Sequence, residues 1–255
     1  MTNNIKFTSD MASLAEASYM EFEKFPTSES GVVSGLIAKG FSQTQANDFI
    51  QHWSVVGGSH QINMPSGFSA TLFQGKANSG ELSDQYVLAI RGTEQTLIDL
   101  VGADGGDILL DGLAVDQIID LYNYTQKLTH TGAYQAAKLI KVDGVDGGPI
   151  DAFYAKTHGL LFLDGVETGI YRIDFETHND GAGLLPVGAQ VHVTGHSLGG
   201  HLAAAFSRLF PSLALDATMI NGAGFTEDFS LLTNDFNVNN FFNMIGGASQ
   251  FDSSK

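Results

Sequence analysis

The chain has 255 residues, of which 43% are hydrophobic and 10% aromatic, and this is enough to bury a sizeable core. Its 12 Lys and Arg stand against 28 Asp and Glu, and the net charge of -16 disfavours nucleic acid and anionic membrane surfaces as partners. The charge favours neutral substrates or cations, although a well-hydrated surface explains it equally well. Alternating strand and helix patterns predict an α/β protein with one domain over residues 1–255.

The location of the protein is only partly constrained by the sequence. No apolar run approaches the roughly 18 residues that a membrane helix needs, so we expect no integral membrane segment. The N-terminus lacks the basic start and apolar stretch of a Sec signal peptide. The absence of Cys excludes a disulfide framework and thiolate chemistry but fixes no compartment. These features are compatible with one-step bacterial export without a Sec signal, and equally with a cytoplasmic location.

The first part of the chain predicts helices followed by a hairpin. Residues 11–25 are expected to form a helix, and another should follow Ser42, because Ser42 and Gln45 have the spacing of a capping box. Residues 68–74 and 85–91 are strand-like and are separated by a loop rich in Gly, Ser and Asn. This pattern predicts a β-hairpin.

The middle of the chain predicts two helices and a small β insertion. Residues 116–128 and 132–142 have helical patterns, and a polar turn of Gly and Asp follows them. Residues 151–175 then hold three short strand signals, which predict the β insertion.

A strand, a tight turn and a helix are predicted without a gap near residue 197. Residues 190–194 are a β-branched run typical of a buried strand, and residues 199–210 are an Ala- and Leu-rich helical stretch. The turn between them reads Gly195-His196-Ser197-Leu198-Gly199. This Gly-x-Ser-x-Gly motif is weak alone, but in this context it is typical of hydrolases that expose a nucleophilic serine. A glycine turn that merely packs a helix on a sheet is the alternative.

Ser197 is accordingly the candidate nucleophile. Side chains two positions before and after it would collide with neighbouring chain in such a strained turn, and Gly195 and Gly199 remove them. The N-terminus of the following helix offers free N–H groups and the positive end of a dipole where an oxyanion would develop. The N–H of Leu198 is the expected oxyanion donor.

A second motif upstream, Ala89-Ile90-Arg91-Gly92-Thr93, combines with the Ser197 turn. Together they resemble the class 3 lipase family, and most of all the bacterial lipases and phospholipases exported with calcium-binding repeats. The similarity runs from about residue 68 to the C-terminus. It implies a secreted bacterial protein that is exported without a Sec signal, with a cytoplasmic location as the alternative. It implies an α/β-hydrolase fold, with a mostly parallel central sheet and helices on both faces. It also implies that Thr93 supplies the second oxyanion donor; a turn residue at a hairpin end is the alternative for Thr93.

The resemblance further implies a movable apolar lid, which residues 97–114 match in position and character. A lid hides lipid-binding surface in water and exposes it at a lipid–water interface, so we expect a neutral lipid or ester as substrate. Asp104, Asp107 and Asp111 lie in this segment, and carboxylates around a glycine turn suit Ca²⁺. Their spacing does not match the lid calcium of related lipases cleanly, so capping and solvated turns are the favoured roles. No cofactor is needed for the chemistry.

A serine nucleophile needs a base, and the base needs a carboxylate to orient it. In the α/β-hydrolase fold these follow in the order Ser, Asp, His. Residues 238–246 are expected to form the strand after one at residues 217–222, and Asp252 would then lie on the next loop, where the acid of the family lies. A polar residue near a frayed terminus is the alternative for Asp252.

The catalytic histidine is not identifiable from the sequence. Only His201 follows the serine, one helical turn along and poorly placed to accept its proton, and His196 should point into packing. The other histidines precede the serine, and among them His158 and His178 are weak candidates. We therefore expect the histidine beyond Lys255, in a longer parent of which this chain is a C-terminally truncated piece.

The sequence thus predicts a serine carboxylester hydrolase, either a triacylglycerol lipase or a phospholipase A1, that forms an acyl-enzyme on Ser197. A peptidase or an acyltransferase would use the same intermediate on the same scaffold. A lipid-binding fragment without turnover is the third hypothesis, because the histidine is not identified.

Overall fold

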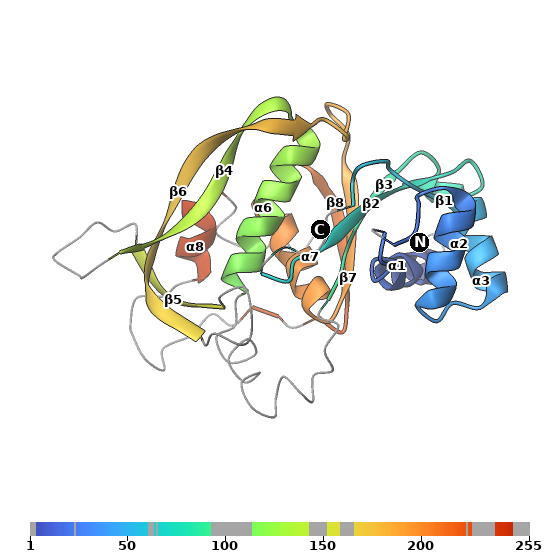
Figure 1. The fold of residues 1–255 in the computed structure, drawn as a ribbon, viewed down its shortest axis with the longest axis horizontal. Coiled ribbons are helices and arrows are strands. Elements are labelled where there is room, and N and C mark those ends of the chain that lie inside the picture. The colour runs from blue at the N-terminus through green and yellow to red at the C-terminus, as the bar shows by residue number, and fades with distance from the viewer. Residues whose placement is uncertain are drawn as a thin grey trace.

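The computed structural model describes residues 4–22, 24–60, 64, 66–92, 114–142, 152–158, 166–222, 224–225 and 238–246. Its helices are α1 (Asn4–Ala17), α2 (Glu29–Ala38), α3 (Gln43–His52), η1 (Gly80–Leu82, a 3-10 turn), α6 (Val115–Thr129), α7 (Leu198–Leu209) and α8 (Val238–Met244). Its strands are β1 (Trp53–Val55), β2 (Ala70–Gly75), β3 (Tyr86–Ile90), β4 (Thr131–Val142), β5 (Ala152–His158), β6 (Val166–Ala182), β7 (Val191–His196) and β8 (Ala214–Ile220). Figure 1 shows α6 between two sheets.

The central sheet has the strand order β1-β2-β3-β7-β8. The pairs β1–β2 and β2–β3 are antiparallel, whereas β3–β7 and β7–β8 are parallel. The α/β class is therefore confirmed, but the described sheet is mixed rather than mostly parallel. The hairpin is also confirmed, with Ala70 opposite Ile90. Because Ile90 also lies beside Gly195, the carboxyl ends of β3 and β7 meet at one edge of the sheet.

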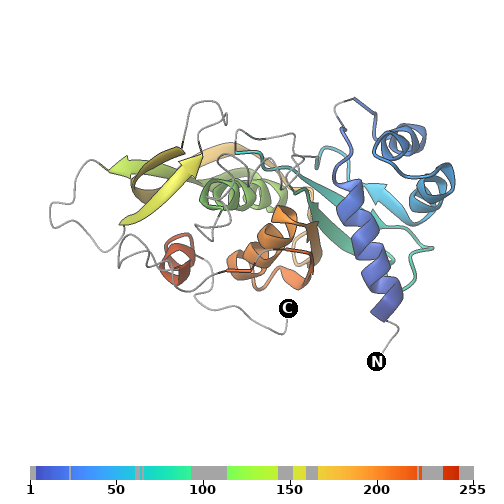
Figure 2. The same cartoon turned by 90° about the horizontal axis from the view of Figure 1, so that it is seen from below.

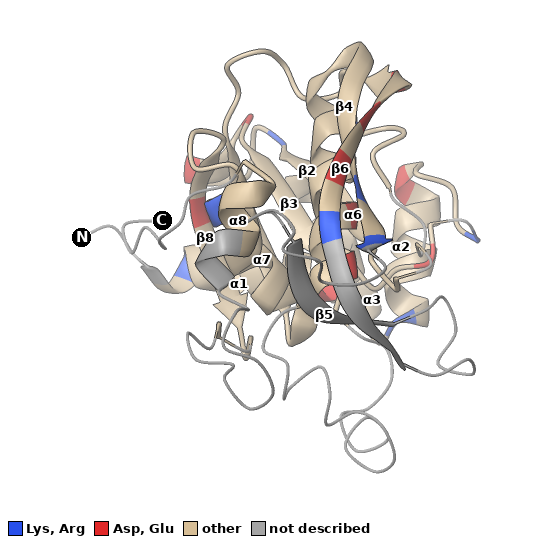
Figure 3. Cartoon of the chain, turned by 90° about the vertical axis from the view of Figure 1, so that its left-hand side faces the viewer, with Lys and Arg blue, Asp and Glu red and all other residues tan. Residues whose placement is uncertain are grey.

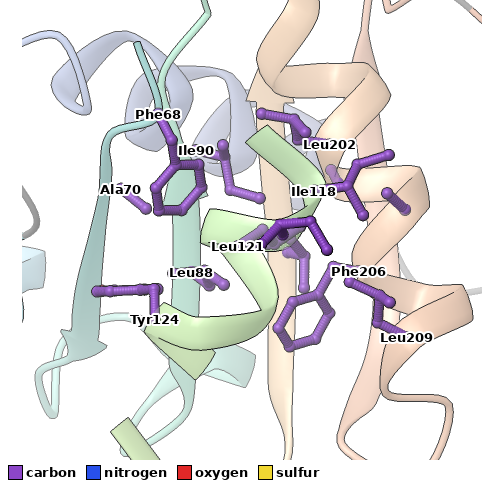
Figure 4. Packing of buried hydrophobic residues seen from close by; sticks show 14 of the residues in the cluster. Phe68, Ala70, Leu88, Ile90, Ile118, Leu121, Tyr124, Leu202, Phe206 and Leu209 are labelled. Carbon is purple, nitrogen blue, oxygen red and sulfur yellow. The ribbon is translucent and has the colours of Figure 1, made fainter. Parts of the chain in front are cut away.

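Two hydrophobic clusters lie on opposite faces of this sheet, as the alternation along β3 requires. Leu88 and Ile90 belong to the cluster with α6 and α7, whereas Val87 and Ala89 belong to the cluster with α1 to α3. Figure 4 shows the first cluster, in which β3 faces both helices. Its labelled members are Phe68, Ala70, Leu88, Ile90, Ile118, Leu121, Tyr124, Leu202, Phe206 and Leu209.

Helix α1 lies across the other face of the sheet, away from α6 and α7 (Figure 2). Met11 and Leu14 are fully buried beneath it. The buried hydroxyl of Thr194 on β7 donates a hydrogen bond to the Met11 carbonyl over 3.1 Å. This contact ties α1 to the strand that leads into Ser197.

The helix expected over residues 132–142 is wrong, because this segment is β4, the outer strand of a second sheet with the order β4-β6-β5. Tyr134 and Ala136 are buried and Gln135 between them is exposed, which is the period-2 pattern of a strand. The β insertion expected at residues 151–175 is therefore larger than predicted. Pairing with β6 along most of its length outweighs the helix propensity of the Ala, Gln, Lys and Leu residues in β4.

The strand expected over residues 238–246 is also wrong, because this stretch contains the helix α8. Phe241, Phe242 and Ile245 are all buried, and the spacing i, i+1, i+4 suits one face of a helix rather than a strand. The guanidinium carbon of Arg208 lies 4.0 Å from the centre of the Phe242 ring, a cation–π contact that holds α8 on α7. The prediction that Asp252 lies on the loop after a strand over residues 238–246 thus loses that strand, and Asp252 itself lies outside the described residues.

Acidic side chains on the second sheet pair with lysines on the same sheet and on α6. Lys127 on α6 lies 2.7 Å from Asp180 on β6, and Lys138 on β4 pairs with Glu176 on β6. Figure 3 shows acidic and basic segments following one another along β6. None of the helices that the structure describes is long and apolar enough to span a bilayer.

Candidate functional site

Ser197 lies at a sharp turn between β7 and α7. Its backbone dihedrals are φ 54° and ψ -124°, a conformation that costs a residue with a side chain about 1–3 kcal/mol. The turn is held from the neighbouring strand, because the Ser197 N–H donates to the carbonyl of Ile220 on β8 over 2.9 Å. Tertiary structure therefore maintains a backbone shape that the local sequence alone would not favour.

The glycines around Ser197 are required by close main-chain contacts. A Cβ on Gly195 would lie 2.2 Å from the Gly199 carbonyl oxygen, and a Cβ on Gly199 would lie 2.2 Å from the Ile90 carbonyl oxygen. Gly200 packs in the same way against Gly222, where a Cβ would lie 2.9 Å from the Gly222 Cα. These contacts bring the ends of β3, β7 and β8 around the first turn of α7.

The hydroxyl of Ser197 does not cap its own helix, although serine at this position commonly does so. The carbonyl of Ser197 instead accepts bonds from the N–H groups of Gly200 and His201, over 2.9 and 3.2 Å. Leu198 is the first residue of α7, and its N–H has no carbonyl one turn back within the helix to bind. A strained serine thus lies at the positive end of a helix dipole, beside the N–H of Leu198.

Gly92, at the end of β3, lies directly against this turn. A Cβ on Gly92 would lie 2.4 Å from the His196 carbonyl oxygen and 2.6 Å from the hydroxyl oxygen of Tyr19. The motif that contains Gly92 and the turn that contains Ser197, which the sequence analysis combined, are therefore adjacent in the structure. Tyr19 was not singled out by sequence analysis, because only the packing of α1 brings it here.

His192 forms a close pair with a carboxylate, but far from Ser197. His192 Nδ1 on β7 lies 2.8 Å from Asp216 Oδ2 on β8, where the two residues are opposite each other. His192 lies five residues before Ser197 in an extended strand, which separates them by about 16 Å at about 3.3 Å per residue. This pair cannot serve Ser197. No sequence signal identified it, since it depends on the register of β7 with β8.

Other described histidines have partners of their own. The ring of His201 is buried in α7 and lies 4.6 Å from the Phe225 ring, centre to centre. His178 on β6 contacts Glu176 over 3.1 Å, and His60 contacts the Thr71 hydroxyl over 3.0 Å. His201 is therefore held by packing, and the contacts described for His178 lie on the second sheet and do not include the turn at Ser197.

Several predicted site residues lie outside the described part of the chain, and they stay predictions. These are Thr93, the lid at residues 97–114 except its last residue Ala114, with Asp104, Asp107 and Asp111, and the acid Asp252. Within the described ranges, no three His, Asp or Glu residues are grouped as a metal site would require. That search does not bear on the three lid aspartates.

No family model, curated protein or solved structure matches this chain. Function is therefore inferred from the geometry around Ser197 and from the motifs of the sequence.

Proposed function

We propose that this chain is a serine carboxylester hydrolase that cleaves lipid esters, with Ser197 as its nucleophile. The observation that carries the proposal is the strained backbone of Ser197 between β7 and α7. Strain of this kind persists where the surroundings fix it, and it clusters at active sites. A turn that served only to pack α7 on the sheet would not need a serine at this position, with its hydroxyl kept off the helix it precedes.

The proposed reaction follows the acyl-enzyme route. The Ser197 hydroxyl oxygen attacks the acyl carbonyl carbon while a base accepts its proton, and the carbonyl oxygen becomes an oxyanion. The N–H of Leu198 and the main chain at Thr93 would hold this oxyanion, and one such donor is typically worth about 3 kcal/mol in the transition state. Collapse of the tetrahedral intermediate expels the alcohol, which takes the proton back. Water then repeats the sequence and releases the acid.

Two features support a neutral lipid ester as the substrate class. The net charge of -16 disfavours anionic substrates, and the paired motifs at Gly92 and Ser197 resemble those of class 3 lipases. The parallel strands β3, β7 and β8, with helices on both faces, are compatible with the α/β-hydrolase arrangement that this proposal includes. Asp252 stays the proposed acid on chain order alone.

Covalent labelling with a fluorophosphonate, followed by intact-mass and peptide analysis, tests the nucleophile. We expect one adduct per chain on Ser197, and no adduct in Ser197→Ala. Ser212→Ala is the matched control, because Ser212 is exposed just beyond α7 and its contact with Gln190 uses only the main-chain carbonyl. A folded chain that takes up no label, or that is labelled at another residue, would contradict the proposal.

A substrate panel then separates the reaction classes. Hydrolysis of triacylglycerol or phospholipid esters that is lost in Ser197→Ala supports the proposed function. Ser197-dependent cleavage of amides, or transfer of the acyl group to an added alcohol in preference to water, would instead indicate a peptidase or an acyltransferase. Binding to liposomes without any turnover would indicate a lipid-binding protein.

A further inference from the structure

The side chain of Tyr19 reaches the edge of the sheet where Ser197 lies. Tyr19 follows α1 in a tight turn, in which its N–H donates to the Glu16 carbonyl over 3.1 Å. Its hydroxyl oxygen lies 2.6 Å from the point that a Cβ on Gly92 would occupy, and the Gly199 nitrogen lies 3.4 Å from the same point. The phenol therefore touches the main chain that joins β3 to residue 93, on the side where α7 begins.

The position of Tyr19 is fixed by its neighbours. Ser18 and Met20 on either side are buried, and the Ser18 hydroxyl donates to the Ala15 carbonyl over 2.6 Å. Helix α1 before them is tied to β7 by the bond from Thr194 to Met11. Tyrosine adds little freedom of its own, because its ring turns about only two side-chain dihedral angles. The contacts of its neighbours thus hold the Tyr19 hydroxyl in place beside Gly92.

Packing alone does not explain a hydroxyl at this place. A phenylalanine ring would fill the same space on the face of the sheet, so the oxygen is the feature that needs a role. Gly92 has no side chain, and a Cβ there would collide with the Tyr19 hydroxyl as well as with the His196 carbonyl. The absence of a side chain at residue 92 leaves the space into which the Tyr19 hydroxyl projects.

We infer that Tyr19 is a positioning residue for acyl transfer, whose hydroxyl holds the main chain at Gly92 in place against the turn that carries Ser197. This inference rests on the proposed function. An oxyanion forms beside this turn only in the transition state and intermediate, so a displaced turn lowers kcat and leaves substrate binding nearly unchanged. Tyr19 touches no reacting atom in this role.

Tyr19→Phe removes the hydroxyl and keeps the ring. We expect kcat for a short-chain ester to fall about tenfold, less than the about 100-fold or more that follows loss of a whole donor, with KM changed less than about twofold. The melting temperature should stay close to that of the wild type. Tyr134→Phe is the matched control, because it also loses one hydroxyl, bonded to Asp180 over 3.0 Å on the second sheet, and should keep its kcat.

A fluorinated tyrosine at position 19 gives a second test that does not depend on Tyr19→Phe folding. Fluorine lowers the pKa of the phenol and keeps the ring and its oxygen in place. At pH values where both phenols are protonated, we expect kcat to equal that of the wild type. As the pH rises, kcat of the fluorinated protein should fall earlier, because its phenol ionises at a lower pH. A role limited to filling space would leave this pH profile unmoved.

The outcomes separate the two proposals. Wild-type kcat in a folded Tyr19→Phe, or an unchanged pH profile with the fluorinated residue, overturns the role of Tyr19 while Ser197-dependent turnover stands. A folded wild-type chain without any Ser197-dependent turnover overturns the proposed function, and the role of Tyr19 falls with it.

Discussion

Gly199 shows how closely single residues are specified around Ser197. The atom that a Cβ on Gly199 would meet is a main-chain oxygen of β3, which cannot rotate away as a flexible side chain can. The glycine therefore serves the approach of two main chains and not the flexibility of the turn.

Gly199→Ala should destabilise the fold by about 1–3 kcal/mol, the usual cost of overpacking, and should abolish fluorophosphonate labelling of Ser197. Urea unfolding and intact-mass analysis measure the two effects. Gly57→Ala is the control, because no atom lies within 4 Å of a Cβ built there, and its stability should change by less than about 0.5 kcal/mol. Normal labelling of Gly199→Ala would show that β3 and α7 do not meet as described.

Asp120 on α6 is a half-buried carboxyl whose proton matters for stability. Burial raises the pKa of Asp120, and a hydrogen bond from the Ser66 hydroxyl opposes this rise only in part. The folded protein thus holds this proton more tightly than the unfolded chain does. Its contribution to stability is complete below the unfolded pKa, about 3.9, and is lost as the pH rises through the folded pKa.

Asp120→Asn keeps an oxygen that can accept the Ser66 bond and removes the ionisation. We expect a higher free energy of unfolding than in the wild type at neutral pH, and a smaller loss of stability as the pH rises from about 4 towards 7. Urea titrations at several pH values measure this. Asp48→Asn, at an exposed carboxylate with 75% side-chain exposure, should leave the pH dependence as it is. Equal slopes in Asp120→Asn and the wild type would contradict the prediction.

At the scale of elements, α1 is the helix that links the N-terminal region to the strand before Ser197. Its described ties to β7 are the bond from Thr194 and the edge of the Phe7 ring against His192 at 5.4 Å. Its buried side chains Met11 and Leu14 belong to the cluster on the same face of the sheet. Because Tyr19 directly follows α1, the position of this helix on the sheet also determines where the Tyr19 hydroxyl lies relative to Gly92.

Thr194→Val replaces the hydroxyl by a methyl group of similar size in a fully buried position. We expect a loss of about 1 kcal/mol in the free energy of unfolding, the net worth of one hydrogen bond, and weaker hydrogen-exchange protection in α1 than in α7. Thr177→Val, on the exposed face of β6, is the matched control. Protection that falls equally in every element would show that Thr194 has no special tie to α1.

At the scale of the molecule, the central sheet carries one hydrophobic cluster on each face, and β3 contributes to both. A shared strand couples the two faces, because β3 cannot lose its contacts on one side and keep its place on the other. This coupling is the physical basis for expecting one domain.

Phe206→Ala and Phe73→Ala remove fully buried rings from opposite faces. Each should lower the stability of one common unfolding transition by about 3–5 kcal/mol. Fluorescence of Trp53, the only tryptophan and a member of the α1 to α3 cluster, should report the same midpoint as far-UV circular dichroism. Two transitions that respond separately to the two variants would show that the faces are independent domains.

The features that could be predicted from the sequence are those that depend on residues close together along the chain. The capping box of Ser42 and Gln45 is confirmed, because both of its hydrogen bonds close within one turn of α3. The strand, turn and helix around Ser197 are confirmed for the same reason, since the glycines and the β-branched run specify that unit locally. Leu198 then follows as the first residue of α7.

Tertiary structure decided the features that depend on contacts between residues far apart in the sequence. Residues 132–142 became a strand because β6 lies beside them, and the strand expected over residues 238–246 proved to be the helix α8, whose aromatic rings pack on α7. The contact of Tyr19 with Gly92 joins segments on different elements, and no local pattern predicts it. The sequence by itself determined the α/β class and the serine turn, since short-range sterics and hydrophobic periodicity decide these. Only the folded chain determined which distant groups surround that turn, because strand register and helix packing depend on contacts far apart in sequence.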